Sequence, residues 1–484
     1  MSLDPENWED IRSLGKTMVG DMLTWLETVR ERPAWTPVPP AVTVRLDEPV
    51  PHAGSALAEV YESFKRDILP YPTGNIHPRF WGWVQGTGTT TGLLADMLAS
   101  TMNPHLAGYD QSAYLIERTV IGWLAELMGF PAESSGILVS GGTEANINGI
   151  SAARVAKAGF DVRTEGLRGG PPLTLYGGAE THSWIYKGCE LMGLGRKAFR
   201  AIPVDADYRI DVAACRARIL KDLESGCRPI AIVGTAGTVN TGATDDLRAL
   251  RALADEFDLW LHVDGAFGAL VAWTSRRDIV AGLASADSLA FDLHKWGYMP
   301  YEAGVALTRD PDAQTAAYKP AGAGVGAYLA SPNGGIAANT TYFADRGLQL
   351  SRGFRALKVW MSMKEQGVDR IAGCIEANIQ QAGRLAGIVE AHEDLELLAP
   401  APLNVVCLRY APKGVAEARL NALNEAILVA IQTRGVAVPS QTVLQGRFAI
   451  RVCITNHRTR DEDIDIFVDA VRTIGAELAA AGDA

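Results

Sequence analysis

The chain has 484 residues and a formal net charge of −11, from 45 Lys and Arg residues against 56 Asp and Glu residues. Hydrophobic residues (48%) and charged residues (21%) occur in proportions that are typical of globular proteins. The acidic balance argues against nucleic acid and anionic membrane surfaces as partners. The length favours one large domain with at least one smaller one, because a single core rarely serves so long a chain.

The amino-terminal stretch MSLDPENWED is acidic and polar, and no run of 18 apolar residues occurs. Both observations argue against a signal peptide and a transmembrane helix. The cysteines are scattered, with no C-x-x-C pair; they are Cys189, Cys215, Cys227, Cys374, Cys407 and Cys453. We therefore expect buried, reduced thiols in a cytoplasmic protein, and neither a disulfide framework nor a metal site.

Residues 7–31 are predicted to be helical, because apolar side chains recur there at helical spacing. The proline-rich stretches RPAWTPVPPAV and LDEPVPHAG that follow are expected to be extended. No core follows this apolar helix directly in the sequence. The helix therefore packs either on a partner subunit or on its own domain, and the sequence favours neither.

From residue 113 to about residue 310, short apolar segments alternate with amphipathic ones. This alternation predicts an α/β domain with a mostly parallel sheet, whose functional loops gather at the carboxyl ends of the strands. Residues 319–340 are rich in Gly and Ala and are typical of a mobile lid. Residues 402–484 have the order strand, helix, strand, helix. We expect an N-terminal helical segment (1–75), a large domain (76–350) and a small α+β domain (351–484).

The segment VSGGTEANINGI (139–150) indicates a strand, two glycines and the start of a helix at Thr143. Backbone N–H groups at a helix amino terminus, together with a hydroxyl, can bind a phosphate. The segment matches neither G-x-x-x-x-G-K-[ST] nor G-x-G-x-x-G, which disfavours a nucleotide site. An ordinary helix cap is the alternative.

Three polar side chains follow predicted strands. Asp264 in WLHVDGAFGA directly follows an apolar strand, where a carboxylate needs a cationic partner such as a pyridinium nitrogen; a loop cap or a metal ligand is the alternative. Lys295 in FDLHKWG ends another strand, and a lysine in a dry pocket has a lowered pKa and can form a Schiff base, whereas most lysines lie at the surface. His182 in GAETHSWIYKG can stack on a planar ring or have a structural role.

A phosphate cradle, a carboxylate, a lysine and a stacking histidine together describe a pyridoxal 5'-phosphate site. The chain resembles the pyridoxal-phosphate-dependent decarboxylases of the glutamate, aromatic-amino-acid and histidine decarboxylase group. The motifs NIHPRFWG, SGGTEAN, ETHSW, HVDGAFGA, FDLHKWG, RGFRALKVW and RFAIRVCITNHRT occur in the family order over about residues 75–460. The resemblance implies an aspartate-aminotransferase-like fold (fold type I) and a homodimer with the active site at the subunit interface.

The resemblance also implies roles for individual residues. Lys295 would form the internal aldimine, Asp264 would pair with the pyridine nitrogen, and His182 would stack on the ring. The other cofactor-binding residues that it implies are Gly142, Thr143, Thr235, Ala266 and His294. For the substrate it implies His105 and Arg451, the latter for the carboxylate, with an exposed arginine on a strand as the alternative; Phe80 is a further substrate candidate.

A loop tyrosine in such decarboxylases protonates the substrate carbon after carbon dioxide leaves. Tyr328 in GAYLASP is favoured for this role, with Tyr318 in AAYKP as the competitor. Two residues depart from the family pattern. Asp292 stands where many relatives have an asparagine near the phosphate, and an acid there must turn away or pair with a cation. His105 stands near an apolar aromatic position of the partner subunit, which argues against an aromatic substrate.

These observations predict α-decarboxylation of an L-amino acid to an amine and carbon dioxide. Aromatic substrates are favoured by an apolar wall that is expected from Phe80, Trp81, Trp83 and Trp296. The alternatives are oxidative decarboxylation–deamination to an aldehyde, or carbon–carbon cleavage as in a lyase. A non-enzymatic homologue with a binding role is the least favoured reading.

Overall fold

The computed structural model of the protein describes residues 2–320, 335–336 and 342–481. The chain divides into two compact units. One consists of Met1–Trp83, Gly387–Leu398 and Cys407–Ala484, and the other of Val84–Ala386 and Ala399–Val406. We call them the terminal unit and the central unit. The three-part domain division expected from the sequence stays a prediction.

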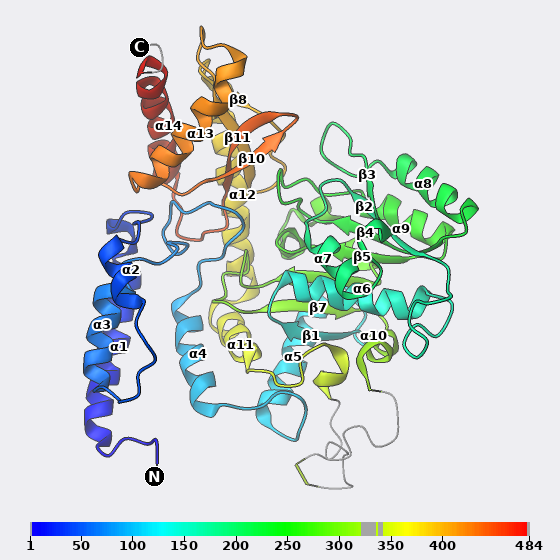
Figure 1. Ribbon diagram of the computed structural model, residues 1–484, viewed down its shortest axis with the longest axis horizontal. Helices are drawn as coiled ribbons and strands as arrows, with labels where there is room; N and C mark the ends of the chain where they lie inside the picture. The colour runs from blue at the N-terminus through cyan, green and yellow to red at the C-terminus, as the bar shows by residue number, and fades with distance from the viewer. Residues whose placement is uncertain (1, 321–334, 337–341, 482–484) are drawn as a thin grey trace. The chain divides into compact units, whose positions relative to one another are not determined.

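The central unit is built on a seven-stranded sheet with the order β1-β7-β6-β5-β4-β2-β3 (Figure 1). The strands are β1 (Ser135–Val139), β2 (Leu173–Gly178), β3 (Phe199–Ile202), β4 (Arg228–Thr235), β5 (Trp260–Asp264), β6 (Ser288–Asp292) and β7 (Gly304–Thr308). Only β7 runs antiparallel to its neighbours. Every residue of β1, β2, β5, β6 and β7 is buried, as is typical of a sheet covered on both faces. The predicted α/β fold with a mostly parallel sheet is confirmed.

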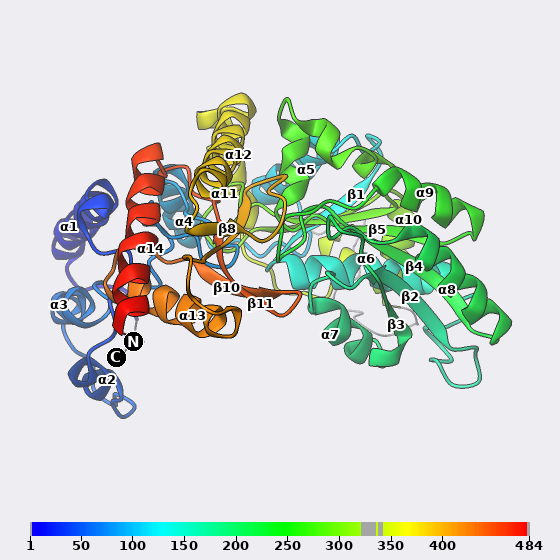
Figure 2. The ribbon, with the colours of Figure 1, turned by 90° about the horizontal axis from the view of Figure 1, so that it is seen from above.

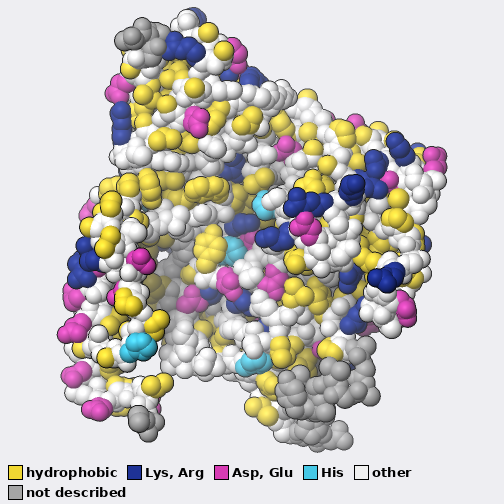
Figure 3. Space-filling model, viewed as in Figure 1, with side chains coloured by type: hydrophobic (Ala, Val, Ile, Leu, Met, Phe, Trp, Pro, Cys, Tyr) yellow, Lys and Arg dark blue, Asp and Glu magenta, His cyan; other side chains and the backbone are white. Residues whose placement is uncertain are grey.

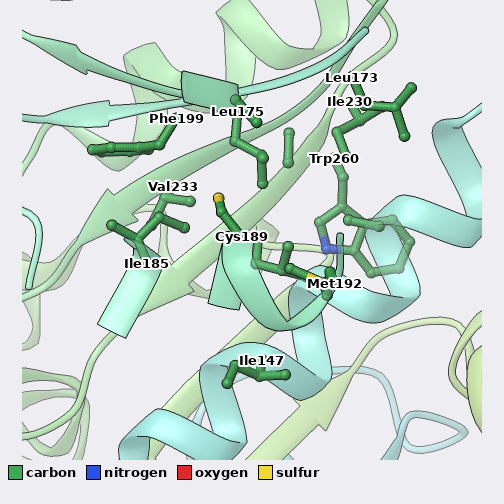
Figure 4. Packing of buried hydrophobic residues seen from close by; sticks show 14 of the residues in the cluster. Ile147, Leu173, Leu175, Ile185, Cys189, Met192, Phe199, Ile230, Val233 and Trp260 are labelled. Carbon is green, nitrogen blue, oxygen red and sulfur yellow. The ribbon is translucent and has the colours of Figure 1, made fainter. Parts of the chain in front are cut away.

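Some helices of the central unit lie against this sheet, and others pack on those helices (Figures 1 and 2). They are α4 (Thr90–Met102), α5 (Ser112–Leu127), α6 (Gly142–Lys157), α7 (Trp184–Leu191), α8 (Val212–Glu224), α9 (Leu247–Glu256), α10 (Pro311–Tyr318), α11 (Arg355–Gln366) and α12 (Val368–Ala391), whose last residues enter the terminal unit. A dry core joins α6 and α7 to the sheet (Figure 4). Its side chains include Ile147, Leu175, Ile185, Cys189, Phe199, Val233 and Trp260. Burial of this apolar surface fixes where α6 begins, and therefore where its amino terminus opens.

The terminal unit joins both ends of the chain. Its helices are α1 (Trp8–Glu27), α2 (Pro40–Leu46), α3 (Leu57–Asp67), α13 (Glu417–Thr433) and α14 (Asp461–Ala481). Its sheet has the order β10-β11-β9-β8, with β8 (Leu395–Leu397), β9 (Val405–Tyr410), β10 (Ser440–Leu444) and β11 (Arg447–Cys453). Asp463 of α14 pairs with Arg30 at 2.8 Å and with Arg79 at 3.2 Å, so residues near the amino terminus pack on the carboxyl-terminal helix.

The proline-rich stretches expected to be extended are non-helical over residues 32–39 and 47–54, but the end of the first stretch begins a helix, α2, at Pro40. A proline is tolerated in the first turn of a helix because its missing N–H would have no partner there. The predicted helix over 7–31 is present as α1, followed by a single 3-10 turn at Val29–Glu31. Across the described residues, no helix combines the length and apolar character needed to cross a bilayer.

Candidate active site

Three adjacent parallel strands end in polar residues at one edge of the central sheet. Thr235, Asp264 and Asp292 are the last residues of β4, β5 and β6, and Thr235 and Asp264 are register partners. Lys295 follows three residues after Asp292. Because parallel strands place their carboxyl ends along one edge, the sheet brings together residues that are far apart in the sequence.

The amino terminus of α6 opens beside this edge. No side chain caps the helix at Gly141, so the first N–H groups remain available to an anion. Glu144, the acid of the first turn, is turned back: its carboxylate accepts hydrogen bonds from the backbone N (3.1 Å) and Oγ (2.6 Å) of Ser140. Thr143 is exposed. A Cβ at position 142 would lie 2.8 Å from Oδ2 of Asp292, so the glycine is required for this close approach.

Asp264 is 4% exposed, and both of its carboxylate oxygens accept a hydrogen bond. The indole Nε1 of Trp184 donates to Oδ2 at 2.7 Å, and the backbone N of Ala266 donates to Oδ1 at 3.1 Å. These two donors fix the carboxylate without neutralising it. Asp264 therefore offers a buried, oriented negative charge to a cationic ligand group.

His182 lies on the loop that leads into α7. Its Nδ1 accepts a hydrogen bond from the backbone N of Trp184 at 3.2 Å, which places the imidazole next to the residue that holds Asp264. Desolvation by the surrounding protein lowers the pKa of His182, while the charge of Asp264 acts in the opposite direction. The residue is exposed, and its neutral form is favoured.

Lys295 and Asp292 form an ion pair, with 2.8 Å between Nζ and Oδ2. The Lys295 side chain is 22% exposed, and that of Asp292 is 1% exposed. Burial acts to lower the pKa of Lys295, but the charge of Asp292, the hydrogen bond to it and the charge of Asp264 outweigh burial, and the pKa is raised. The lowered pKa expected from the sequence is therefore wrong for the chain by itself, because the sequence did not reveal this carboxylate as a partner of the lysine.

His294 is buried between this ion pair and an aromatic ring. Its Nδ1 accepts a hydrogen bond from the backbone N of Ala303 at 3.1 Å, and its ring centroid lies 4.4 Å from that of Tyr301. Its Nε2 is 3.8 Å from Oδ2 of Asp292. Because burial lowers the pKa of His294, the neutral ring is favoured, and Lys295 remains the cation closest to Asp292.

A buried hydrogen-bond network that the sequence motifs did not reveal connects α6 to the sheet. Asn146 donates from Nδ2 to the carbonyl of Gly142 at 2.7 Å, so its Oδ1 accepts from His262 Nε2 at 2.8 Å. Nδ1 of His262 then accepts from the hydroxyl of Ser288 at 2.7 Å. Burial lowers the pKa of His262 to about 3, and the ring is neutral. A histidine inside the apolar strand WLHVD was the available signal, since a buried histidine needs partners.

Gly149 of α6 packs directly against His262 and Ser288 of this hydrogen-bond network, and substituting it with alanine is expected to destabilise the protein. The added Cβ would lie 2.5 Å from His262 Nδ1 and 2.7 Å from Ser288 Oγ. Overpacking of this kind costs about 1–3 kcal/mol. Gly383→Ala in α12 is the matched control, because a Cβ there meets nothing within 4 Å. That change should stabilise the helix by about 0.5–1 kcal/mol. Urea unfolding of both variants measures the difference, and equal effects would contradict this account of the packing.

The predicted substrate residues belong to both units. Phe80 and Arg451 belong to the terminal unit, where both are 3% exposed. Nη1 of Arg451 donates to the carbonyl of Trp83 at 2.7 Å and to Oγ of Ser440 at 3.2 Å, so it is a held, buried arginine. His105 is exposed in the central unit beside Tyr109, at 6.0 Å between ring centroids.

Of the four aromatic residues expected to form an apolar wall, only Trp83 is exposed. Trp81 is 1% exposed and Trp296 is 0% exposed, and their indoles donate inward to Thr459 and Asn378, respectively. Neither ring can form part of an open wall in the chain as described, whereas Trp83 is 55% exposed.

Of the two candidate loop tyrosines, the structure describes only Tyr318. Tyr328 lies outside the described residues. Tyr318 is the last residue of α10, a helix that packs on α6, and burial raises the pKa of its phenol to about 12.

The central site fits pyridoxal 5'-phosphate on three observations. The uncapped amino terminus of α6 with its glycines suits a phosphate, the oriented carboxylate of Asp264 suits a cationic ring nitrogen, and Lys295 supplies an amine for the aldehyde. Ala266 offers a small side chain beside Asp264, and Thr235 is held at the same edge by Asp245. The buried Asp292 is the one acid among these groups that would face a phosphate at close range.

Known proteins resemble the chain over nearly its whole length. An aromatic-L-amino-acid decarboxylase of Bacillus atrophaeus is 30% identical over 97% of this chain and 96% of its own. An L-2,4-diaminobutyrate decarboxylase of Rhizobium meliloti (strain 1021) is 31% identical over 89% of this chain and 84% of its own. The crystal structure of Oryza sativa TDC with PLP and tryptamine shares the fold, with a TM-score of 0.90 over 99% of this chain and 100% of that one, at 23% identity.

The family model described as the pyridoxal-dependent decarboxylase conserved domain matches residues 39–411, which is most of the chain. Its cofactor is pyridoxal 5'-phosphate, in agreement with the donors and acceptors at the central site. The chain therefore belongs to the pyridoxal-phosphate-dependent (group II) amino acid decarboxylase family.

Proposed function

We propose that the chain converts an L-amino acid, with an aromatic one favoured, to its amine and carbon dioxide. The observation that carries the proposal is the placement of Asp264 and Lys295 at the ends of neighbouring strands, with the open amino terminus of α6 beside them. When bound, pyridoxal 5'-phosphate supplies an electron sink for the bond that breaks at the α-carbon. The protein supplies binding, orientation and charge.

In this proposal each residue at the central site has a distinct task. The N–H groups of Gly142 and Thr143 would hold the phosphate, Lys295 would supply the amine for the aldehyde, and Asp264 would keep the ring nitrogen protonated. His182 would stack on the ring, and Ala266 would place a small side chain against it. A neutral His182 is suited to its task, because an imidazolium would place a second positive charge beside the nitrogen that Asp264 must stabilise.

Two observations support an aromatic substrate that is held by its carboxylate. In the terminal unit, Arg451 donates to the backbone carbonyl of Trp83, a residue that is 55% exposed. The ring of Phe80 lies 6.2 Å from that of Trp83, measured between ring centroids. An aromatic-L-amino-acid decarboxylase is also among the relatives that match nearly the whole chain. Exposed His105 would suit a polar side chain, and it is the residue that weakens the aromatic assignment.

A substrate panel tests this assignment. The protein loaded with pyridoxal 5'-phosphate is incubated separately with the twenty L-amino acids, dihydroxyphenylalanine, 5-hydroxytryptophan and L-2,4-diaminobutyrate, and products are identified by mass spectrometry. The proposal predicts the highest kcat/KM for an aromatic amino acid. A preference for diaminobutyrate or for an acidic amino acid would reject the aromatic assignment and leave the decarboxylase assignment intact.

We propose Tyr328 as the residue that protonates the α-carbon, and Tyr328→Phe is expected to lower amine formation and raise aldehyde formation. Tyr318→Phe is the matched control. Its phenol is packed at the end of α10 beside α6, which supports a structural role for this residue. The amine-to-aldehyde ratio of both variants, measured on the same substrate, decides between the two tyrosines. A fall of this ratio in Tyr318→Phe alone would assign the role to Tyr318.

We also propose that the protein is a homodimer with its active site at the subunit interface. No residue of the twenty-residue helix α1 is buried in the described chain. Apolar side chains of α1 and of the segment through α3 are exposed, among them Trp8, Leu23, Val44, Leu57 and Val60. Exposed apolar surface on this scale is typical of a protein interface. Light scattering should give twice the mass of one chain; the mass of a single chain would reject the dimer.

Basic and acidic side chains are interspersed on the face in Figure 3, which gives no support to a nucleic-acid partner.

A further inference from the structure

Asp292 is placed as the counter-ion of Lys295. It ends β6, and its backbone N donates to the carbonyl of Ala266 at 2.9 Å, which fixes the residue beside the Asp264 loop. Its side chain is 1% exposed. Oδ2 lies 2.8 Å from Lys295 Nζ, and Oδ1 has no hydrogen-bond partner among the residues that the structure describes. A carboxylate this buried is stable only with a cation beside it.

The other titratable groups around the pair do not provide that cation. Besides the two members of the pair, Lys295 faces Asp264 of β5, His182 of the loop before α7, His294 of its own turn and Tyr301. Burial lowers the pKa of both histidines and raises that of Tyr301, so all three are neutral near pH 7. Glu144 of α6 is bound to Ser140. Glu302 and Lys358 act on His294, and the charged groups that act on Lys295 itself are the two carboxylates of Asp292 and Asp264.

We propose that Asp292 acts as a positioning residue that holds Lys295 as an ammonium ion in the cofactor-free chain, so that loading the cofactor requires this ion pair to break. The chemistry explains the requirement. The ammonium group must first lose a proton, because the nitrogen lone pair forms the new bond to the aldehyde carbon. The two remaining N–H protons then leave with the aldehyde oxygen as water, and a carbon–nitrogen double bond is formed.

The same geometry places the Asp292 carboxylate close to the expected phosphate position. A Cβ at Gly142 would lie 2.8 Å from Oδ2, so the carboxylate borders the glycines where a phosphate would be held. While Lys295 remains an ammonium ion, it neutralises this acid. Once the lysine has reacted, the negative charge of Asp292 lies next to another anion, and repulsion opposes cofactor binding. Both effects predict that an uncharged residue at position 292 accelerates loading.

The direct test measures Lys295 without the cofactor. Full-length protein freed of cofactor is labelled with trace acetic anhydride over a range of pH, and acetylation of the Lys295 peptide is followed by mass spectrometry. Asp292→Asn should move the midpoint of the labelling curve down by about 1–3 pH units, which is the effect of losing an opposite charge at this distance. Glu144→Gln is the matched control, since it removes an acid near the same helix terminus that does not pair with Lys295. It should leave the midpoint where it is.

A second readout is the rate at which the visible absorbance band appears when pyridoxal 5'-phosphate is added at pH 7. Asp292→Asn should raise this rate by about tenfold for each unit that the midpoint falls. An unchanged midpoint in Asp292→Asn, or an equal shift in Glu144→Gln, would overturn the proposal. Asp292→Ala gives the same readout if the amide variant does not fold.

The inference rests on the proposed function only through the identity of Lys295 as the residue that takes the aldehyde. A shifted labelling midpoint without any visible band would therefore reject the cofactor role of Lys295 and keep the ion pair. A visible band with an unshifted midpoint would reject the ion pair and keep the cofactor role of Lys295.

Discussion

Replacing Lys295 with alanine is expected to abolish both turnover and the visible absorbance that the protein acquires with pyridoxal 5'-phosphate. Lys295 is the lysine that the central sheet presents at the ends of β5 and β6, with Nζ 2.8 Å from a buried carboxylate. Without it, none of the residues described at these strand ends offers an amine to the aldehyde. Absorbance spectra and product formation under identical loading conditions measure the effect.

Lys358 is the matched control. It is also a buried lysine paired with an aspartate, at 2.9 Å from Asp96, but it lies on α11 and its Nζ donates to the carbonyls of Pro300 and Tyr301. Lys358→Ala should keep the visible band, even if the protein becomes less stable. Turnover and the band surviving in Lys295→Ala would contradict the assignment of the site, whereas their loss in both variants would show only that the substitutions damage the fold.

The second large effect is expected from Asp264→Asn. Both carboxylate oxygens accept hydrogen bonds, from Trp184 and from the backbone of Ala266, so an amide must turn its NH₂ group toward one of these donors. It also cannot stabilise a protonated ring nitrogen. We expect kcat to fall by about 100- to 1,000-fold, the size of the loss when one preorganised electrostatic partner is removed.

Asp222→Asn separates this effect from general damage. Asp222 is also a buried carboxylate, 3% exposed, but its partners are Tyr176 and Arg200 rather than a ligand site. It should lower stability and leave the kcat of the folded fraction intact. Steady-state kinetics with the best substrate, corrected for the bound cofactor, compares the two. A folded Asp264→Asn protein with unchanged kcat would reject the pairing role.

The order of the helices and strands could be predicted because each is marked by a pattern of neighbouring residues in the sequence. Each buried strand of the central sheet is a short apolar run, and Asp264 and Lys295 are polar residues placed directly at the end of such a run. The strands β8 and β10 escaped prediction. The first has three residues, and the second alternates buried and exposed positions at the edge of its sheet, so neither forms a long apolar run.

The electrostatics of the site could not be predicted, because they depend on the direction of side chains. The sequence places Asp292 three residues before Lys295, yet only the turn after β6 brings Oδ2 to the ammonium and raises the pKa of the lysine. The inward burial of Trp81 and Trp296 has the same origin: an aromatic residue can face a ligand or a core, and packing with Thr459 and Asn378 decides for the core.

The most direct test of the account is the stoichiometry of the reaction with the best substrate of the panel, labelled in its carboxyl carbon. Labelled carbon dioxide, the amine and dissolved oxygen are measured together on the loaded protein. An α-decarboxylase must release one carbon dioxide and one amine for each amino acid consumed, with no uptake of oxygen. An aldehyde and ammonia formed with uptake of oxygen, or consumption of the amino acid without labelled carbon dioxide, would contradict the account.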